Sequence, residues 1–342
     1  MSLKTKVLIA GIGGASLGTE IAKCLSLAKR YSIYGCDIST IAFGHYMNDF
    51  EKTFVADTNN YVESVISICK KNKIRYIIPG GEKPMVLLAK GAKQMMDADV
   101  TVVSNSPEVI TTFSDKKKGF EKLSSLGFTI PLTKEISESK DLEKFPFPAI
   151  VKPSSGTGGS DSVFLAEDKD QCLAYLELLK RNKRKAIVQE YISLDEGEFT
   201  IGVLSLPDQS VVDAVVMKRV FNSKLSISFQ NSSGLISSGY SQGLIADFPK
   251  FKKQAIEIAK AVSSSGAINI QARVKKGVLI PFEINPRFSA STYLRALAGF
   301  NEIDFALQNL VSGKKKFSFR VKEGYYLRSF DEIFVPLKKE KK

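Results

Sequence analysis

The chain has 342 residues, 44% of them hydrophobic and 25% charged, which predicts a folded protein of two or three units with sizeable cores. Its net charge is +13, but the lysines come in short, dispersed runs without a zinc-finger or RRM signature, so an anionic small molecule is favoured over nucleic acid as a partner. The single histidine, His45, excludes multi-histidine zinc sites, so any metal is expected to have oxygen ligands.

Strand and helix patterns alternate through the first third of the chain. Strands are expected within residues 6–14, 31–39, 74–82 and 100–105, and helices within 15–30, 60–73 and 83–96. This alternation predicts a doubly wound parallel sheet, that is, a Rossmann-like α/β domain. Ligands bind beyond the carboxyl ends of such strands, so the glycine turn at 11–14 and the substrate candidates Gly80, Gly81 and Glu82 lie where a ligand is expected.

The first glycine turn permits two interpretations. Gly11, Gly13 and Asp37 match part of a dinucleotide fingerprint, which would make the protein an NAD(P)-dependent oxidoreductase. The third glycine of that fingerprint is replaced by Ser16. A tight turn that packs a helix against a strand explains the same residues, so both interpretations stay open.

From about residue 113 the chain changes to a capped helix, a strand that delivers Lys152, and a loop of small residues. The loop residues are Ser154, Ser155, Gly156, Thr157, Gly158, Gly159 and Ser160. Small residues let backbone N–H groups approach phosphate oxygens, and Lys152 can neutralise phosphate charge. No Gly-Lys-Ser/Thr follows, so this is not a Walker A loop, and a hairpin tip is the alternative.

Residues 186–205 predict two strands joined by a short acidic linker. The edge of an apolar strand can hold a purine through backbone groups, and a carboxylate such as Glu198 suits ribose hydroxyls. An ordinary strand connection is the alternative.

Residues 268–285 predict a β-hairpin that turns at Gly277. A three-residue loop would place Val274 opposite Val278 and Asn269 opposite Glu283, with Gln271 diagonal to Glu283. Pro281 fits a strand only at a sheet edge or a bulge, which leaves this register open.

Gln271, Glu283 and Asn285 form a polar row on this otherwise apolar hairpin. Burying such a row is costly unless it coordinates something, and one carboxylate with carboxamide oxygens suits Mg²⁺. Arg287, just beyond, can meet a phosphoryl or carboxylate group. The hairpin therefore predicts a platform for a metal ion and phosphate.

Two helices broken at Gly299 are expected within residues 289–313, followed by a small strand pair and a basic tail over 312–342. Arg295 could face a substrate carboxylate or be a solvated surface arginine.

The order of these motifs resembles the ATP-grasp superfamily, in its carbamoyl-phosphate-synthase-like and PylC-like branch. The resemblance rests on Asp115–Lys116, Lys152 with its loop, and the stretches QEYI, GEF, INIQ and FEINPRFS, and it covers about residues 5–311. It implies a pre-ATP-grasp domain at 1–112, an α+β ATP-grasp domain at 113–311 (lid-bearing part 113–186, metal and nucleotide part 187–311), and terminal strands with a tail at 312–342.

The resemblance implies an ATP-dependent carboxylate–amine ligase that forms an acyl phosphate and releases ADP and phosphate. Mg²⁺, or Mn²⁺ in its place, would be the metal, held by the polar row, and Arg287 would stabilise the phosphoryl group in transfer. Gln271 departs from the second glutamate of many such ligases. The remaining implied contacts are Lys116 and Lys152 with phosphate, Glu190, Tyr191 and Ile192 with adenine, Glu198 with ribose, and Lys218 or Arg219 with phosphate.

A catalytically silent ATP-binding regulator is a further alternative, although retention of the whole polar row with Lys152 and Arg287 argues against it. The expected partners are a small carboxylate and an amine, and the resemblance suggests a homodimer. Four widely spaced cysteines predict reduced thiols, and the chain shows neither a signal peptide nor an apolar run of about 18 residues, so we expect a cytoplasmic protein without membrane contact.

Overall fold

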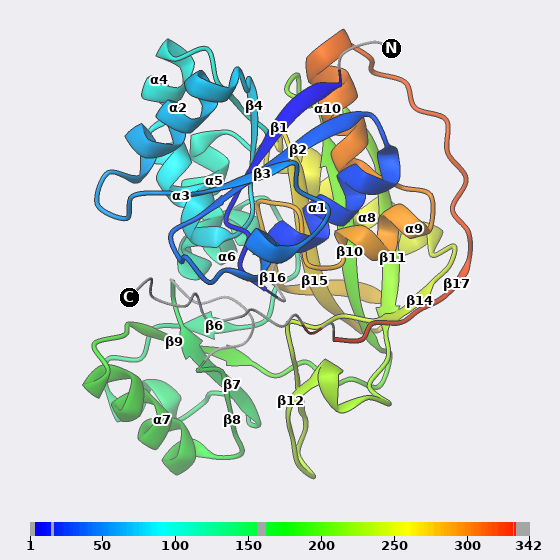
Figure 1. Ribbon diagram of the computed structural model, residues 1–342. Helices are drawn as coiled ribbons and strands as arrows, with labels where there is room; N and C mark the ends of the chain where they lie inside the picture. The colour runs from blue at the N-terminus through cyan, green and yellow to red at the C-terminus, as the bar shows by residue number, and fades with distance from the viewer. Residues whose placement is uncertain (1–3, 15–16, 156–161, 331, 333–342) are drawn as a thin grey trace. The chain divides into compact units, whose positions relative to one another are not determined.

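The computed structural model describes residues 4–14, 17–155, 162–330 and 332 (Figure 1). The chain forms two compact units, one of residues 1–103 with 328–342 and one of residues 104–327. The second unit begins at Ser104 because the next residue, Asn105, is anchored in it. The Asn105 side chain donates to the carbonyl oxygens of Ala267 (2.7 Å) and Pro286 (3.3 Å) and accepts from the Ser264 hydroxyl (2.9 Å).

The first unit contains a five-stranded parallel sheet, which confirms the predicted α/β fold. Its order is β3-β2-β1-β4-β5. Residues 7–10 of the central strand are fully buried, as expected for a strand covered by helices on both faces. The strands are β1 (Thr5–Ala10), β2 (Tyr31–Asp37), β3 (Lys52–Val55), β4 (Tyr76–Pro79) and β5 (Thr101–Val102), and the helices are α1 (Leu17–Ala28), η1 (Phe43–Tyr46), α2 (Tyr61–Asn72), α3 (Glu82–Lys90) and α4 (Ala92–Asp97).

Three glycines let helices approach this sheet closely. Gly11 ends β1 with a φ of +99°, and a Cβ atom on either Gly18 or Gly80 would lie 1.9 Å from the Gly11 carbonyl oxygen. The glycines at these positions are therefore explained by backbone packing.

The second unit is built on two larger antiparallel sheets. A four-stranded sheet has the order β6-β9-β7-β8, and a six-stranded sheet has the order β16-β15-β10-β11-β14-β17. A separate pair, β12-β13, lies in the connection between β11 and β14. The strands are β6 (Thr133–Lys134), β7 (Ala149–Pro153), β8 (Phe164–Ala166), β9 (Ala186–Glu190), β10 (Glu198–Ser205), β11 (Val211–Arg219), β12 (Ile227–Gln230), β13 (Leu235–Ser237), β14 (Gly243–Ile245), β15 (Ala267–Lys275), β16 (Val278–Asn285) and β17 (Gly324–Tyr326).

Helices cover these sheets and bury apolar side chains against them. Phe199 and Ile201 of β10, for example, pack with Ala255 and Ile258 of one helix in the core of the six-stranded sheet. The helices are α5 (Pro107–Ser114), α6 (Lys116–Ser125), η2 (Ser139–Leu142), α7 (Lys169–Arg181), η3 (Lys224–Ser226), α8 (Pro249–Ala261), α9 (Thr292–Leu297) and α10 (Glu302–Ser312).

The register of the β15–β16 hairpin differs from the predicted one. The turn has two residues, Lys276 and Gly277, both with positive φ, so Lys275 rather than Val274 lies opposite Val278. A register shift between Gln271 and Ala272, where β16 holds Phe282 as an extra residue, moves the pairing by one more position.

As a result, Gln271 lies directly opposite Glu283, and Asn269 lies opposite Asn285. Pro281 is tolerated because β16 is the edge strand and the bulge is adjacent, both of which were foreseen.

The end of the chain also departs from the prediction in part. The two helices broken at Gly299 are present, and Gly299 has a φ of +107°. In place of a terminal strand pair, the described part of residues 312–342 contains a single strand, β17, which pairs with β14. Among the described residues, no helix is both long enough and apolar enough to cross a membrane.

Candidate functional site

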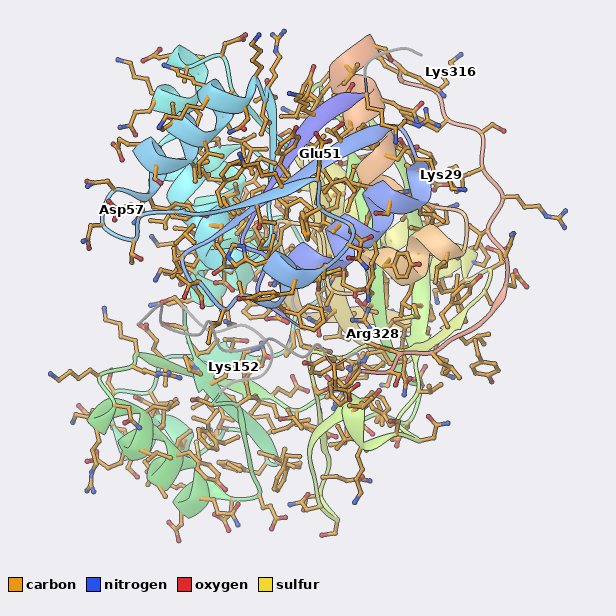
Figure 2. The ribbon with its side chains drawn as sticks, in the orientation of Figure 1. Lys29, Glu51, Asp57, Lys152, Lys316 and Arg328 are labelled. Carbon is orange, nitrogen blue, oxygen red and sulfur yellow. The ribbon has the colours of Figure 1, made fainter. Side chains whose placement is uncertain are left out.

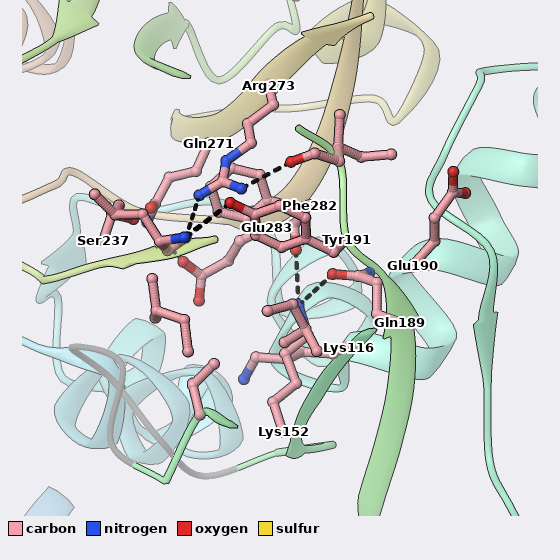
Figure 3. Close-up of a pocket in the computed structure, with 15 residues that line it drawn as sticks. Lys116, Lys152, Gln189, Glu190, Tyr191, Ser237, Gln271, Arg273, Phe282 and Glu283 are labelled. Atoms are coloured by element: carbon pink, nitrogen blue, oxygen red, sulfur yellow. Dashed lines mark hydrogen bonds between the residues drawn. The ribbon is translucent and has the colours of Figure 1, made fainter. Parts of the chain in front are cut away.

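A pocket in the second unit is walled by both of its larger sheets (Figure 3). Strands β7 and β9 of the four-stranded sheet, β15 and β16 of the six-stranded sheet, and β13 all contribute to it. The pocket is lined by Lys116, Ile150, Lys152, Val163, Gln189, Glu190, Tyr191, Ile192, Leu235, Ile236, Ser237, Gln271, Arg273, Phe282 and Glu283. The pocket thus brings together the predicted phosphate lysines, the purine segment and two of the predicted metal ligands.

Lys152 is a buried titratable side chain that lines this pocket. Its side chain is on β7, and Figure 2 labels it. The ammonium donates to the Gln189 side-chain oxygen (2.8 Å) and to the Phe282 carbonyl oxygen (2.9 Å). Burial lowers the pKa of Lys152 to about 7; the nearby Glu283 carboxylate opposes this shift and the positive charge of Lys116 adds to it. An anion bound beside Lys152 would favour its charged form.

Lys116 is brought to the pocket by the start of α6. Asp115 caps this helix by accepting a hydrogen bond from the Lys118 N–H (3.2 Å), and the Lys116 N–H donates to the Ser154 carbonyl oxygen (2.8 Å). Asp115 also forms an isolated bridge with Ser155. The start of the predicted phosphate loop is thereby fixed beside Lys116, whereas Gly156, Thr157, Gly158, Gly159 and Ser160 lie outside the described residues.

The polar row of the hairpin is formed with Gln271 directly opposite Glu283, a closer pairing than the predicted diagonal one. The Gln271 amide donates to the Glu283 carboxylate (2.6 Å), and both side chains line the pocket. Asn285 follows on β16 but is not among the lining residues. The described residues contain no group of three His, Cys, Asp or Glu side chains suited to a metal.

One carboxylate with two carboxamides fits Mg²⁺, which takes few protein oxygens and completes its shell with water and phosphate. The residues present thus fit the metal that the resemblance implies, provided that phosphate oxygens contribute.

Arg287 lies two residues beyond the metal row and is half-buried. Its guanidinium donates to the Phe288 carbonyl oxygen (2.9 Å) and to the Asn285 side-chain oxygen (3.5 Å). These contacts hold the guanidinium next to Asn285.

Glu198 and Arg219, predicted to meet ribose and phosphate, are buried together with a third residue, Arg273. Glu198 is fully buried; it accepts from Arg219 Nη1 (3.2 Å) at one carboxylate oxygen and from Arg273 Nε (2.9 Å) at the other. Neither Glu198 nor Arg219 lines the pocket. In this structure Glu198 therefore has no exposed carboxylate oxygen for the predicted contact with ribose.

The predicted purine segment borders the pocket as expected. Glu190, Tyr191 and Ile192 all line it. The Glu190 carboxylate is bonded to Lys275 (2.9 Å), and the Ile192 carbonyl oxygen accepts from Arg273 Nη1 (2.7 Å). The Ile192 carbonyl is thus already engaged by a pocket side chain.

Two other candidates lie elsewhere in the second unit. Lys218 is exposed at the end of β11, where a Cβ atom on Gly197 would lie 2.9 Å from its Cε atom. Arg295 is neither a surface residue nor open to a substrate, because it is fully buried and its Nη2 is 2.6 Å from the Glu302 carboxylate. Neither lines the pocket.

The substrate candidates Gly80, Gly81 and Glu82 belong to the first unit, where β4 ends and α3 begins. The Gly80 N–H donates to the Ala10 carbonyl oxygen (2.7 Å), which joins this turn to β1.

The dinucleotide interpretation of the first unit is not favoured by its geometry. One carboxylate oxygen of Asp37 accepts from the Ile12 N–H (2.8 Å) and the other from the Ser39 N–H (3.0 Å). A Cβ atom on Gly14 would lie 2.8 Å from Phe43 Cβ, so a side chain already covers this turn. Asp37 and Gly14 therefore have structural roles.

Several pocket residues were not predicted, above all Arg273, Gln189, Phe282 and the strand β13. Arg273 could have been found, because it lies two residues from Gln271 and side chains two apart in a strand share a face. Gln189 and Phe282 directly precede the predicted residues Glu190 and Glu283, and alternation would direct them to the opposite face. The strand β13 approaches from a distant segment, which sequence alternation does not reveal.

Comparison with known proteins places this geometry in a family. The model of the ATP-grasp domain matches residues 113–291, and that of the PylC-like N-terminal domain matches residues 7–103. The chain belongs to the ATP-grasp family. The carbamoyl phosphate synthase large chain of Clostridium beijerinckii is 25% identical over 339 residues, which cover 92% of this chain and 30% of that protein. The chain thus spans about 30% of the length of this relative.

Solved structures share the ATP-grasp fold at low identity. The biotin carboxylase domain of the 2-oxoglutarate carboxylase from Hydrogenobacter thermophilus has a TM-score of 0.69 and 15% identity, covering 95% of this chain and 74% of that one. N5-carboxyaminoimidazole synthetase from Staphylococcus aureus has a TM-score of 0.68 and 15% identity, covering 93% and 81%. Both similarities support the two-part architecture described above.

Proposed function

We propose that this protein is an ATP-dependent carboxylate–amine ligase that activates its acid as an acyl phosphate and releases ADP and phosphate. The observation that carries the proposal is the meeting of Lys152, Lys116 and the Gln271–Glu283 pair in one pocket. Two cations beside a carboxylate–carboxamide pair suit a polyphosphate and its metal.

Each pocket residue has a defined task in this reaction. Lys152 and Lys116 neutralise the phosphates, and Gln271 with Glu283, assisted by Asn285, would hold Mg²⁺ or Mn²⁺. The bound metal would supply charge neutralisation at the transferring phosphate. Arg287 is held at the end of the metal row, where it stabilises charge that develops during transfer.

The reaction needs no reactant other than ATP, the acid and the amine. A carboxylate oxygen of the acid attacks the γ-phosphorus, and the bond to ADP breaks. The amine then attacks the acyl carbon, phosphate leaves with that carboxylate oxygen, and the amine loses a proton to solvent. The products are an amide, ADP and phosphate.

The relatives support the nucleotide part of this proposal. The H. thermophilus biotin carboxylase domain was crystallised as a dimer with MgADP, ADP and bicarbonate, and the S. aureus synthetase with ADP. By analogy with these proteins, we propose that this protein binds a nucleotide in the Lys152 pocket, acts on small-molecule substrates and forms a homodimer.

The proposal is tested by phosphate release from MgATP across a matrix of carboxylic acids and amines, with Glu283→Gln as the control variant. Release that requires one acid and one amine together, and that is lost in the variant, supports the ligase. ATP binding without release for any pair would favour the silent regulator, and a change in NADH fluorescence on mixing would favour the oxidoreductase.

A further inference from the structure

The Glu198 carboxylate is separated from the nucleotide pocket by the Arg273 guanidinium. Arg273 Nε lies 2.9 Å from one Glu198 oxygen, and Arg219 Nη1 lies 3.2 Å from the other. Glu198 is fully buried and absent from the pocket lining, whereas Arg273 is part of it. At this position the pocket therefore presents hydrogen-bond donors in place of a carboxylate.

Arg273 lines the pocket together with Gln271 and Ile192 (Figure 3). It is two residues from Gln271 on the same face of β15, which is about 6.6 Å along the strand from the metal row. Its Nη1 donates to the carbonyl oxygen of Ile192, at the purine end (2.7 Å). The part of a nucleotide between base and phosphates is its sugar, so Arg273 is placed beside the sugar.

Arg273 is also fixed in this position. Its Nη2 donates to the Leu235 carbonyl oxygen (2.7 Å), and its guanidinium lies over the rings of Tyr191 (4.7 Å) and Phe282 (5.9 Å). Two carbonyl oxygens, one carboxylate and two rings together hold the guanidinium, and Arg273 as a whole is only 6% exposed. Displacement of the Arg273 side chain would remove one of the two arginines that pair with the buried Glu198 carboxylate.

We propose that Arg273 sets the sugar selectivity of the nucleotide pocket by covering Glu198, so that the protein accepts 2′-deoxyadenosine nucleotides nearly as well as adenosine nucleotides. The proposal rests on the proposed function, because it assumes an adenine nucleotide in this pocket. A free carboxylate would accept hydrogen bonds from the ribose hydroxyls, whereas the three guanidinium nitrogens of Arg273 already donate to Glu198, Ile192 and Leu235. Loss of the 2′-hydroxyl then leaves no carboxylate at this position without its partner, so the loss costs little.

The test is isothermal titration of MgADP and of its 2′-deoxy analogue into the full chain. For the wild type we expect dissociation constants within about threefold of each other. In Arg273→Met one oxygen of Glu198 becomes available to the ribose, and a hydrogen bond to a charged group raises the preference for ADP to about tenfold or more. The matched control is Arg219→Met, which also removes a cation from Glu198 but does not line the pocket, so its ratio stays at the wild-type value.

Glu198→Gln provides a second measurement that does not depend on Arg273→Met folding. If Arg273 covers Glu198, this variant keeps the wild-type ratio. A wild-type preference for ADP of tenfold or more that is lost in Glu198→Gln would overturn the proposal and leave the proposed function intact. Absence of binding for both nucleotides in the wild type would overturn the proposed function and this inference together.

Discussion

Nucleotide binding should be coupled to protonation of Lys152. The pKa of this buried ammonium is lowered from 10.5 to about 7 in the free protein. At pH 8 most Lys152 side chains are therefore neutral, and at pH 6 most are charged. Because polyphosphate favours the charged form, binding of MgADP should take up most of one proton at pH 8 and little at pH 6. Affinity should fall about tenfold per pH unit above pH 7.

The assay is calorimetric titration of MgADP at both pH values in buffers of different ionisation enthalpy. The slope of the observed binding enthalpy against the buffer ionisation enthalpy gives the proton uptake. Lys152→Arg is the matched control, since its guanidinium stays charged and should bind without uptake. Lys116→Met should reduce the uptake at pH 8, because the Lys116 charge helps to lower the pKa of Lys152. Uptake below about 0.2 proton in the wild type at pH 8 would refute the reasoning.

The same shift affects the stability of the free protein. Between pH 7 and 10.5 the unfolded chain keeps the Lys152 proton that the folded chain has lost, so stability should rise with pH in this window relative to Lys152→Met. Between pH 7 and pH 8 the unfolding free energy of the wild type should rise by about 1 kcal/mol relative to that of Lys152→Met. Urea unfolding at the two pH values measures it.

Three further predictions follow from the site and its supports. Glu283→Ala should abolish turnover, measured as phosphate release. Its thermal midpoint, measured by calorimetry, should stay within about 2 °C of wild type, because Glu283 is half-buried and lies near a strand end. Activity within a few-fold of wild type would contradict the metal assignment. Glu302→Gln should lower the unfolding free energy by about 3–5 kcal/mol, because it leaves the fully buried Arg295 without its carboxylate. Urea unfolding measures this loss, and a loss below about 1 kcal/mol would contradict the buried pair. Arg287→Ala should lower kcat far more than it weakens ATP binding, since the charge it meets develops during transfer; an equal effect on both would place Arg287 in ground-state binding.

The sequence predicts much of the site because local patterns carry it. The alternation of strands and helices predicts the parallel sheet, and Pro281 indicates an edge strand or a bulge, both of which occur. The apolar strand before Lys152 is visible within one element, and the polar row of Gln271 and Glu283 within one hairpin. Each of these features depends on residues close to one another in the chain.

The features that the sequence does not predict depend on how the strands pair. The turn at Lys276 and the bulge at Phe282 each move the hairpin register by one position. The alternation of side chains along β10 is compatible with Glu198 facing the pocket. Arg219 and Arg273 from the neighbouring strands nevertheless enclose it. Which of several charged side chains reaches the pocket is decided by these pairings.

The fate of the substrate oxygen tests the central claim most directly. With the carboxylate of the acid labelled with ¹⁸O, one label should appear in the released phosphate for each amide formed, and the nucleotide product should be ADP. The oxygen that attacks the γ-phosphorus leaves with it when the amine enters, and in the proposed mechanism the Lys152 pocket and the Gln271–Glu283 pair would act on the terminal phosphate. Unlabelled phosphate, or AMP with pyrophosphate, would contradict the account.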